Sequence, residues 1–423
     1  MIRRRSFTQM AFSAAALTGL YPFAQANTSV RASIVVIGGG FAGVTTARML
    51  KALNPNLQIT LVERNRTYTA CPFSNLVITH TRPLKLQQFT YGHVSDSGIE
   101  VVHASAQTVD PEMHRVQLAN GLTLAYDKLV MSPGIELDFA AVSGYSPQGA
   151  EQMPHAWLAG KQTTILAQRL RQVPTGGLVL MSIPENPYRC PPGPYERASL
   201  IAHYLKQHNP RAKLLLLDAK DTFSKQALFN QAWQKHYGAL IEWRGGSNDG
   251  RIRAVSPDQN LVETDFDRFK PDLANIIPPQ RAASIARDAG LTNASHWCPI
   301  DATTFASTLQ PDIYVLGDAC IANAMPKSAF AANAQGKICA LQIARNLAGQ
   351  TPVSAKLINT CYSLTTPEHA ISVAGVYRPD GNRFAEIPEA GGTSVIQAAP
   401  GTRQLEAHYA RDWFTTITRE VFG

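Results

Sequence analysis

The sequence predicts an α/β protein with two units built around parallel sheets and a small C-terminal α+β domain. In the first unit, a β-branched run at residues 34–37 leads directly into a glycine-rich loop, a helical pattern and a second strand. A similar alternation of helices and apolar strands returns within residues 150–285. From about residue 354 onward, short strands are separated by turns such as Pro379-Asp-Gly381. A chain of 423 residues is long enough to give these domains substantial cores.

The glycine-rich loop marks the first unit as a Rossmann-like dinucleotide-binding unit. The order is a strand at 34–37, the loop, a helix, and a strand at 59–62 that ends in Glu63. Glu63 is placed to accept a hydrogen bond from a ribose hydroxyl. Three glycines, Gly38, Gly40 and Gly43, allow the backbone to turn tightly, to approach a pyrophosphate and to pack the helix closely on the strand.

Two later segments are predicted to return to this unit. Strands with a turn at Asn120-Gly121 form a meander over residues 99–130. A strand at 312–316 then leads into Gly317 and Asp318, which would place a carboxylate beside the ribityl chain of a flavin. Together with the N-terminal loop, this dipeptide favours FAD over NAD. The FAD-binding domain is therefore assigned to residues 32–149 and 286–352.

The second Rossmann-like unit, residues 150–285, lacks a glycine loop after its first strand. Strands are predicted at 177–181 and 213–217, the latter ending in Asp218, and helices at 163–171, with Thr163 as the N-cap, and at 197–205. After the first strand, residues 182–196 carry five prolines and Cys190. Proline has no N–H group, so this segment lacks the successive donors that bind a pyrophosphate. We expect no NAD(P) site there.

The N-terminus predicts export. Three arginines, Arg3 to Arg5, precede an apolar run from Met10 to Ala24, and Ala24-Gln25-Ala26 is a small-residue cleavage site. The Arg-Arg-x-Phe element at residues 4–7 resembles a twin-arginine signal, so we expect an export signal at residues 1–26 and a periplasmic protein. The run is too short for a membrane span, and an interfacial anchor helix is the alternative.

Charge and cysteine spacing exclude several classes of protein. Without the three arginines of the signal, Lys and Arg number 36 instead of 39 against 31 acidic residues, which leaves a net charge of +5. No other basic run occurs, so we expect no nucleic-acid binding. The six cysteines are spaced too widely for a compact disulfide scaffold or a metal site, and no Cys-x-x-Cys-His motif would hold haem on this chain.

Four further features give the chain a resemblance to a known family. The glycine-rich loop occurs together with Ala70-Cys71-Pro72 and with three later segments, Arg189–Glu196, Val315–Ile321 and Asn359–Ser363. With these motifs the chain resembles the flavoprotein subunit of flavocytochrome c sulfide dehydrogenase over essentially its whole mature length. The resemblance implies a fold of the FAD-dependent disulfide-reductase type, with a C-terminal flavin and interface domain at residues 353–423.

The resemblance also implies roles for four residues. Cys71 matches a cysteine that holds FAD through a thioether; without the family, a buried small side chain is the simpler interpretation. Cys190 and Cys361 match a redox-active disulfide over the flavin, and a purely structural disulfide is the alternative. Glu196 matches an acidic group that manages a proton near that disulfide, and a solvated glutamate at a helix start explains it equally well. The remaining three, Cys298, Cys320 and Cys339, are assigned to packing.

These features predict an enzyme that oxidises sulfide to sulfur or polysulfide through Cys190, Cys361 and FAD, and passes the electrons to a c-type cytochrome subunit. The nearest alternative is a sulfide:quinone oxidoreductase. That enzyme requires an amphipathic helix at the membrane, for which residues 412–422 are a candidate, although we expect this segment to dock on its own domain. A non-catalytic flavin-bearing binding or assembly protein is the alternative of another class, and it has no need of the two cysteines together.

Overall fold

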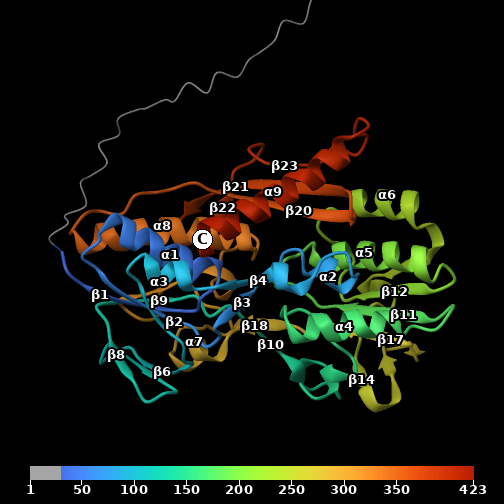
Figure 1. Cartoon of the computed structure of the whole chain (residues 1–423), viewed down its shortest axis with the longest axis horizontal. Coiled ribbons are helices and arrows are strands. Elements are labelled where there is room, and N and C mark those ends of the chain that lie inside the picture. The colour runs from blue at the N-terminus through green and yellow to red at the C-terminus, as the bar shows by residue number, and fades with distance from the viewer. Residues whose placement is uncertain (1–29) are drawn as a thin grey trace, which may run out of the picture.

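The computed structural model describes residues 30–423, and the predicted export signal at residues 1–26 lies outside this part of the chain. Two parallel sheets lie side by side, and the C-terminal strands and last helix extend across both (Figure 1). The architecture is thus the predicted one, with two α/β units and a C-terminal α+β domain.

The first sheet has five parallel strands in the order β19-β9-β1-β2-β5. Val35 and Val36 of the central strand β1 are almost fully buried, as expected for an apolar run in a parallel sheet. Helices α1 (Phe41–Leu53) and α8 (Ala329–Leu347) pack against each other beside it (Figure 1). The strands are β1 Ser33–Ile37, β2 Gln58–Val62, β5 Glu100–Val102, β9 Lys128–Met131 and β19 Ile313–Val315.

Short elements surround this sheet. The predicted meander is an antiparallel sheet in the order β6-β7-β8, and Gly121 in its turn has a φ of +87°, which glycine adopts readily. Its strands are β6 Ala106–Asp110, β7 Arg115–Leu118 and β8 Thr123–Ala125. Two further pairs and three short helices complete the unit: β3 Thr67–Thr69 with β4 Gln88–Thr90, β10 Ile135–Leu137 with β18 Gln280–Ala282, α2 Ser74–Ile78, α3 Gly92–Asp96 and α7 Ser284–Asp288.

The second sheet has four parallel strands in the order β13-β12-β11-β17. These are β11 Leu178–Ile183, β12 Lys213–Asp218, β13 Ile241–Arg244 and β17 Leu273–Ile276. Three helices accompany them, α4 Lys161–Arg171, α5 Gly193–His208 and α6 Gln226–His236. A small antiparallel sheet follows, with β14 Ala254–Ser256, β15 Leu261–Glu263 and β16 Arg268–Phe269.

Two helix starts differ from the prediction. Thr163 is not the N-cap of α4, because the helix begins two residues earlier, after Gly160, and the Thr163 hydroxyl accepts a hydrogen bond from the Gly160 N–H at 3.2 Å. Gly160 has a φ of +128°, which favours glycine at that position. Helix α5 begins at Gly193, four residues before the predicted start. Pro192 and Pro194 are compatible with this start, because the first N–H groups of a helix have no partner within the helix.

The C-terminal domain is built on a long hairpin. Strands β20 (Leu357–Thr366) and β21 (His369–Asp380) have ten and twelve residues, so the prediction of only short strands is wrong. The hairpin contacts α8 of the first unit and α5 and α6 of the second. The two remaining strands, β22 Arg383–Glu386 and β23 Gly392–Thr393, pair with β21.

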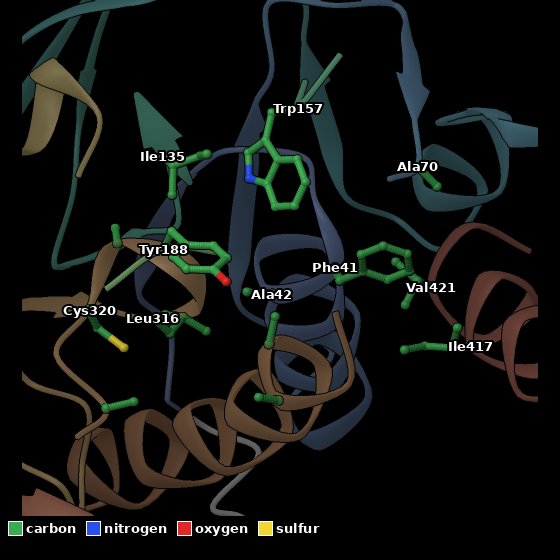
Figure 2. Close-up of a cluster of buried hydrophobic side chains, with 14 of the residues drawn as sticks. Phe41, Ala42, Ala70, Ile135, Trp157, Tyr188, Leu316, Cys320, Ile417 and Val421 are labelled. Atoms are coloured by element: carbon green, nitrogen blue, oxygen red, sulfur yellow. The ribbon is translucent and has the colours of Figure 1, made fainter. Parts of the chain in front are cut away.

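The last helix, α9 (Thr402–Phe422), docks on its own chain. Phe414, Ile417 and Val421 are buried. Figure 2 shows Ile417 and Val421 on the side that faces Phe41 of α1, as expected for a docked segment. Within residues 30–423, no helix combines the length and the apolar character that a membrane span requires.

Candidate active site

One cavity, with a volume of about 910 Å³, lies where the two sheets and the C-terminal hairpin meet. Gly43 lies behind its wall, and a Cβ on Gly43 would stand 2.0 Å from the backbone oxygen of Gly38, so this glycine serves close packing. The other nine predicted site residues line the cavity: Gly38, Gly40, Glu63, Cys71, Cys190, Glu196, Gly317, Asp318 and Cys361.

The start of α1 forms an anion-binding wall of this cavity. Gly38 has a φ of +104°, and a Cβ there would stand 2.2 Å from the backbone oxygen of Ser132, so only glycine fits. Gly40 is the N-cap of α1, and among the described residues no side chain caps the first turn. That turn also contains no acidic residue. Its N–H groups and the helix dipole are therefore available to a phosphate.

Two carboxylates follow strands of the first sheet. Glu63, directly after β2, accepts a hydrogen bond from the Gly39 N–H at 2.9 Å. Asp318, just after β19, lies 3.9 Å from the guanidinium of Arg189. Burial raises the pKa of Asp318, while Arg189 and Lys327 oppose the rise. Both carboxylates line the cavity, where hydroxyl groups of a dinucleotide would find acceptors.

The cavity fits FAD. Its volume falls in the usual range for cofactor sites. The indole nitrogen of Trp157 is buried in the wall and has no hydrogen-bond partner among residues 30–423. Figure 2 shows this indole in the same buried cluster as Tyr188 and Ala42 of α1. A buried donor without a partner points to an acceptor on a ligand. The α1 N-terminus would hold the pyrophosphate, and Glu63 and Asp318 would hold hydroxyl groups.

Cys71 lies in the turn before α2 and faces the same cavity. Its sulfur is 3.9 Å from the carbonyl oxygen of Trp157, which also accepts a hydrogen bond from Arg189. Cys71 is only partly buried, which disfavours the interpretation as a small core side chain. Its attachment to a flavin stays a prediction.

Cys190 lies near the end of the proline-rich loop after β11 in a left-handed backbone conformation, with a φ of +57°. Its N–H donates to the Lys327 carbonyl, and its own carbonyl accepts from the Gly193 N–H, both at 2.8 Å. These bonds fix the thiol beside the first turn of α5. Burial raises the pKa of the Cys190 thiol, and Cys361 and Glu196 raise it further, so the uncharged form is favoured.

Cys361 lies on β20 and reaches the cavity from the C-terminal hairpin. The side-chain amide of Asn359 donates to the Cys361 sulfur at 3.3 Å, and the Ser328 hydroxyl in turn donates to Asn359. Cys190 and Cys361 line the same cavity, and Cys361 is among the groups that raise the pKa of Cys190. All six described cysteines are free thiols in the structure, and the predicted Cys190–Cys361 disulfide stays a prediction.

Glu196 is not the solvated side chain that was the alternative interpretation. One of its carboxylate oxygens accepts from the Asn75 amide and the other from the Leu364 N–H, both at 2.9 Å. Burial raises the pKa of Glu196, while the hydrogen bonds from Leu364 and Asn75 oppose the rise. A carboxyl group of this kind in the same cavity as two thiols is suited to proton transfer.

Two basic residues of the site were not predicted from the sequence. Arg197 is buried, and its guanidinium lies 5.1 Å from the centre of the Trp157 ring. Burial lowers the pKa of Arg197 to about 10. Lys225, from the start of α6, reaches the backbone of Cys361. The sequence does hold a signal for Arg197, because a charged residue next to Glu196 in an otherwise apolar helix suggests a buried functional group. Lys225 belongs to no recognisable motif.

The acid that ends β12 in the second unit is used by the protein itself. Asp218 is fully buried and accepts hydrogen bonds from the Tyr195 hydroxyl at 2.6 Å and from the Trp243 indole at 3.1 Å. Its other oxygen accepts from the Lys220 ammonium at 2.6 Å. The Tyr195 ring stacks on Phe223 with ring centres 3.7 Å apart. Side chains therefore fill the position at which such a unit would hold a nucleotide ribose.

Models of known families match three parts of the chain. One described as "Sulfide dehydrogenase [flavocytochrome c] flavoprotein chain, central" matches residues 163–278. One described as "Flavocytochrome c sulphide dehydrogenase, flavin-binding" matches residues 353–422. A more general family, pyridine nucleotide-disulphide oxidoreductase, matches residues 32–168. These matches confirm the predicted fold class and the resemblance.

Individual relatives agree with these matches. The flavoprotein chain of a flavocytochrome c sulfide dehydrogenase from Chlorobaculum thiosulfatiphilum is 50% identical over 44 residues, which are 10% of this chain and 92% of that sequence. A mitochondrial sulfide:quinone oxidoreductase from Mus musculus is 21% identical over 331 residues, 76% of this chain and 72% of that one. The X-ray structure of the sulfide:quinone oxidoreductase from Aquifex aeolicus shares the fold, with a TM-score of 0.72 and 17% identity over 92% of this chain and 91% of that one.

Proposed function

We propose that this protein oxidises sulfide with FAD and passes the electrons to a c-type cytochrome subunit. The premise is that the chain belongs to the family of flavocytochrome c sulfide dehydrogenase flavoprotein chains. One observation carries the proposal. Cys190 of the second unit and Cys361 of the C-terminal hairpin line one cavity, which is suited to FAD. Packing alone does not require two thiols and the Glu196 carboxyl group to line one cavity, whereas thiol–disulfide chemistry does.

A disulfide between Cys190 and Cys361 would supply the electrophile that sulfide oxidation needs. Hydrosulfide attacks one sulfur, a new S–S bond forms as a persulfide, and the old bond breaks to leave the other cysteine as a thiolate. Glu196 takes up the hydrosulfide proton or returns it to a thiol. When bound, FAD supplies the two-electron acceptor for this dithiol chemistry, and Cys71 is its proposed covalent anchor.

NADH and NADPH are not the proposed electron donors. Two observations support this. The loop after β11 carries Cys190 and prolines in place of a glycine-rich phosphate site. The acid after β12, Asp218, is fully occupied by Tyr195, Trp243 and Lys220. The second unit therefore supplies a thiol where related units bind a nucleotide.

The proposed electron acceptor is a cytochrome subunit, with sulfide:quinone oxidoreductase as the second candidate. The second candidate is favoured by the relatives from Mus musculus and Aquifex aeolicus, which carry that name. The first is favoured by the two matches at residues 163–278 and 353–422. It is also favoured by α9, whose apolar side chains Phe414, Ile417 and Val421 pack inside the chain and not toward a membrane. The two acceptors are distinguished by adding purified cytochrome c or a soluble quinone to the sulfide-reduced protein. The acceptor that reoxidises the flavin faster is the one the enzyme uses.

A periplasmic location is part of the same proposal. It rests on the signal-like sequence of residues 1–26, which lies outside the described residues. Mass spectrometry of the protein from its native source should give a mature N-terminus close to residue 27. A mature chain that keeps Met1 would contradict export by cleavage.

Anaerobic addition of sulfide to the purified flavoprotein tests the central claim. We expect sulfide to bleach the flavin absorbance, and Cys190→Ser or Cys361→Ser to abolish the bleaching. Cys339→Ala, which changes a buried cysteine of α8 outside the cavity lining, should bleach as the wild type does. Undiminished reduction in both serine variants would refute the mechanism, and absence of bleaching in the wild type would favour a non-catalytic flavin carrier.

Two further measurements test the cofactor assignments. NADH should bleach the flavin far more slowly than sulfide, and equal rates would overturn the interpretation of residues 182–196. After acid precipitation, flavin should stay with the protein pellet of the wild type and move to the supernatant for Cys71→Ser. Flavin in the wild-type supernatant would refute covalent attachment.

A further inference from the structure

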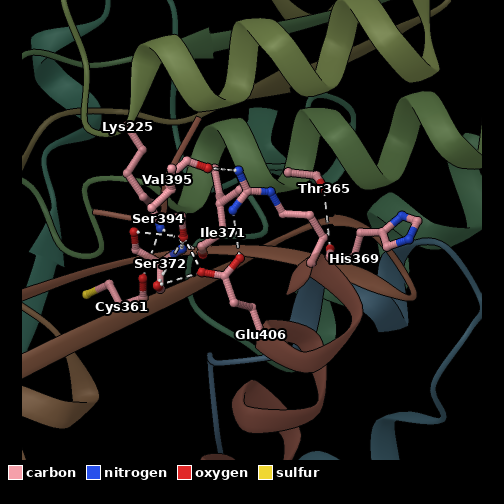
Figure 3. A network of polar contacts seen from close by, with 10 residues as sticks. Lys225, Cys361, Thr365, His369, Ile371, Ser372, Ser394, Val395 and Glu406 are labelled. Atoms are coloured by element: carbon pink, nitrogen blue, oxygen red, sulfur yellow. Dashed lines mark hydrogen bonds and ion pairs between the residues drawn. The ribbon is translucent and has the colours of Figure 1, made fainter. Parts of the chain in front are cut away.

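The side chain of Lys225 reaches from the second unit into the C-terminal hairpin and contacts the backbone of Cys361. Lys225 precedes α6 in a left-handed backbone conformation, with a φ of +62°, and only 8% of its surface is exposed. Its ammonium group donates to the Cys361 carbonyl at 2.9 Å, to the Ser363 hydroxyl at 2.8 Å and to the Ile371 carbonyl at 3.5 Å. Figure 3 shows this side chain reaching the hairpin beside Cys361. All three acceptors lie on β20 and β21, so the cation is fixed with respect to the strand that carries the thiol.

Four acidic groups from neighbouring elements act on this cation. They are Cys361 on β20, Glu196 on α5, Cys190 in the loop before α5, and Glu406 on α9. Burial lowers the pKa of Lys225 to about 8, while these four groups oppose the fall. Two further cations, Arg189 and Arg197, line the same cavity as the thiols and interact electrostatically with Cys190.

A buried cation is costly unless the structure gives it a compensating partner. Neutral carbonyls and a hydroxyl satisfy the hydrogen bonds of Lys225, but they do not neutralise its charge. The groups able to do so are the acidic neighbours, and opening a Cys190–Cys361 bond would create a thiolate among them. The positive charge of Lys225 therefore stabilises the thiolate form, in which the Cys190–Cys361 bond is open, more than the disulfide form.

We propose that Lys225 is a positioning residue for the thiol pair: its ammonium group, fixed beneath Cys361, stabilises the thiolate that appears at Cys361 when the pair is open. This inference deepens the proposed function and rests on its thiol pair. A purely structural role, as a link between the second unit and the hairpin, predicts a loss of stability in variants but no change in thiol reactivity.

Thiol modification separates these roles without using sulfide turnover. The flavoprotein is reduced anaerobically with dithiothreitol, freed of reductant and treated with methyl methanethiosulfonate, which reacts with thiolates. Mass spectrometry then follows the peptide that contains Cys361 across a series of pH values. In Lys225→Met we expect modification near neutral pH to slow by about tenfold or more, with the rise of the pH profile moved upward, because an opposing charge at this range favours the thiolate. Lys225→Arg should restore most of the rate.

Lys220→Met is the matched control, because Lys220 is also a largely buried lysine of the second unit but pairs with Asp218 and not with the hairpin. It should lower stability and leave the modification of Cys361 unchanged. If Lys225→Met does not fold, Lys225→Gln keeps donors for the hairpin without the charge and carries the same expectation. A pH profile in Lys225→Met or Lys225→Gln that superimposes on the wild-type profile would overturn the inference. Failure of sulfide to bleach the wild-type flavin would instead refute the proposed function.

Discussion

The two parallel-sheet units have similar topology, but they differ in the residues that follow the carboxyl ends of their first strands, β1 and β11. After β1, Gly38 and Gly40 leave the start of α1 open to the cavity. After β11, a proline-rich loop carries Cys190, and the first turn of α5 contains Tyr195, whose ring is fully buried and stacks on Phe223. One strand end is shaped to receive a ligand, and the other is filled by the protein and presents a thiol.

The acids of the two units differ in the same way. Glu63 faces the cavity and contacts the glycine loop through the Gly39 N–H. Asp218 is buried and fully engaged by neighbouring side chains. A shared topology therefore does not imply a shared site, because the side chains at the strand ends decide whether a nucleotide can enter.

Replacing Asp218 is expected to give the largest effect, because its side chain is buried at the carboxyl end of the second sheet, which the protein's own side chains fill. In Asp218→Ala, the Tyr195 hydroxyl and the Lys220 ammonium lose their buried partner. We expect the free energy of unfolding to fall by about 3 to 5 kcal/mol, as for other broken buried ion pairs, in urea denaturation. Asp267→Ala removes a surface pair with Arg244 in the same unit and should cost within about 1 kcal/mol. Equal losses in the two variants would contradict the structural role of Asp218.

Gly43 tests the packing of the open end. In Gly43→Ala, the new Cβ would stand 2.0 Å from the Gly38 backbone oxygen, so α1 must shift away from β1. We expect the free energy of unfolding to fall by about 3 kcal/mol and the flavin content to fall with it. Gly92→Ala is the control, because nothing lies within 4 Å of its added Cβ, and its denaturation midpoint should barely change. Full flavin content in Gly43→Ala would show that the loop tolerates displacement.

The open end was predictable from the sequence because its parts are local. Strand, glycines, helix, second strand and Glu63 follow one another within about thirty residues, and each has a composition that reports its structure. Family resemblance was needed to connect Cys190 with Cys361, which lie 171 positions apart. Lys225 escaped prediction because its burial depends on how α6 meets the hairpin, and no local pattern encodes that contact.

Local errors had local causes. Thr163 was chosen as an N-cap by residue type, but Gly160 holds the positive φ that starts α4. The second helix start was predicted at Arg197, whereas α5 begins at Gly193 and accommodates Pro194 in its first turn. Only short strands were predicted for the C-terminal domain, because turn signals such as Pro379-Asp-Gly381 mark where strands end but not how long the paired strands are, and pairing along β20 and β21 is almost continuous.

Glu63 sharpens the comparison through ligand binding. Glu63→Gln keeps the shape of the side chain but weakens a charge-assisted acceptor at the cavity. In a Cys71→Ser background, which removes the proposed covalent bond, we expect FAD affinity to fall by about tenfold and the free energy of unfolding of the apoprotein to change by less than about 1 kcal/mol. Titration with FAD, followed by flavin fluorescence, measures the first quantity. Glu100→Gln, on β5 of the same sheet and outside the cavity lining, should bind FAD normally.

Glu196 gives the smallest expected effect, a pH dependence of stability at the filled end. Burial raises the pKa of Glu196 above its ordinary value near 4.5, so the folded protein keeps this proton at pH values where the unfolded chain has lost it. The free energy of unfolding therefore falls as pH rises through the interval between the two values, and stability from this group is greatest below it. Glu196→Gln has no such proton, so its stability relative to the wild type should increase across that interval in urea denaturation at successive pH values. A constant difference between Glu196→Gln and the wild type at all pH values would mean that the carboxyl group is already ionised in the folded protein, and that it enters sulfide oxidation as a base and not as an acid.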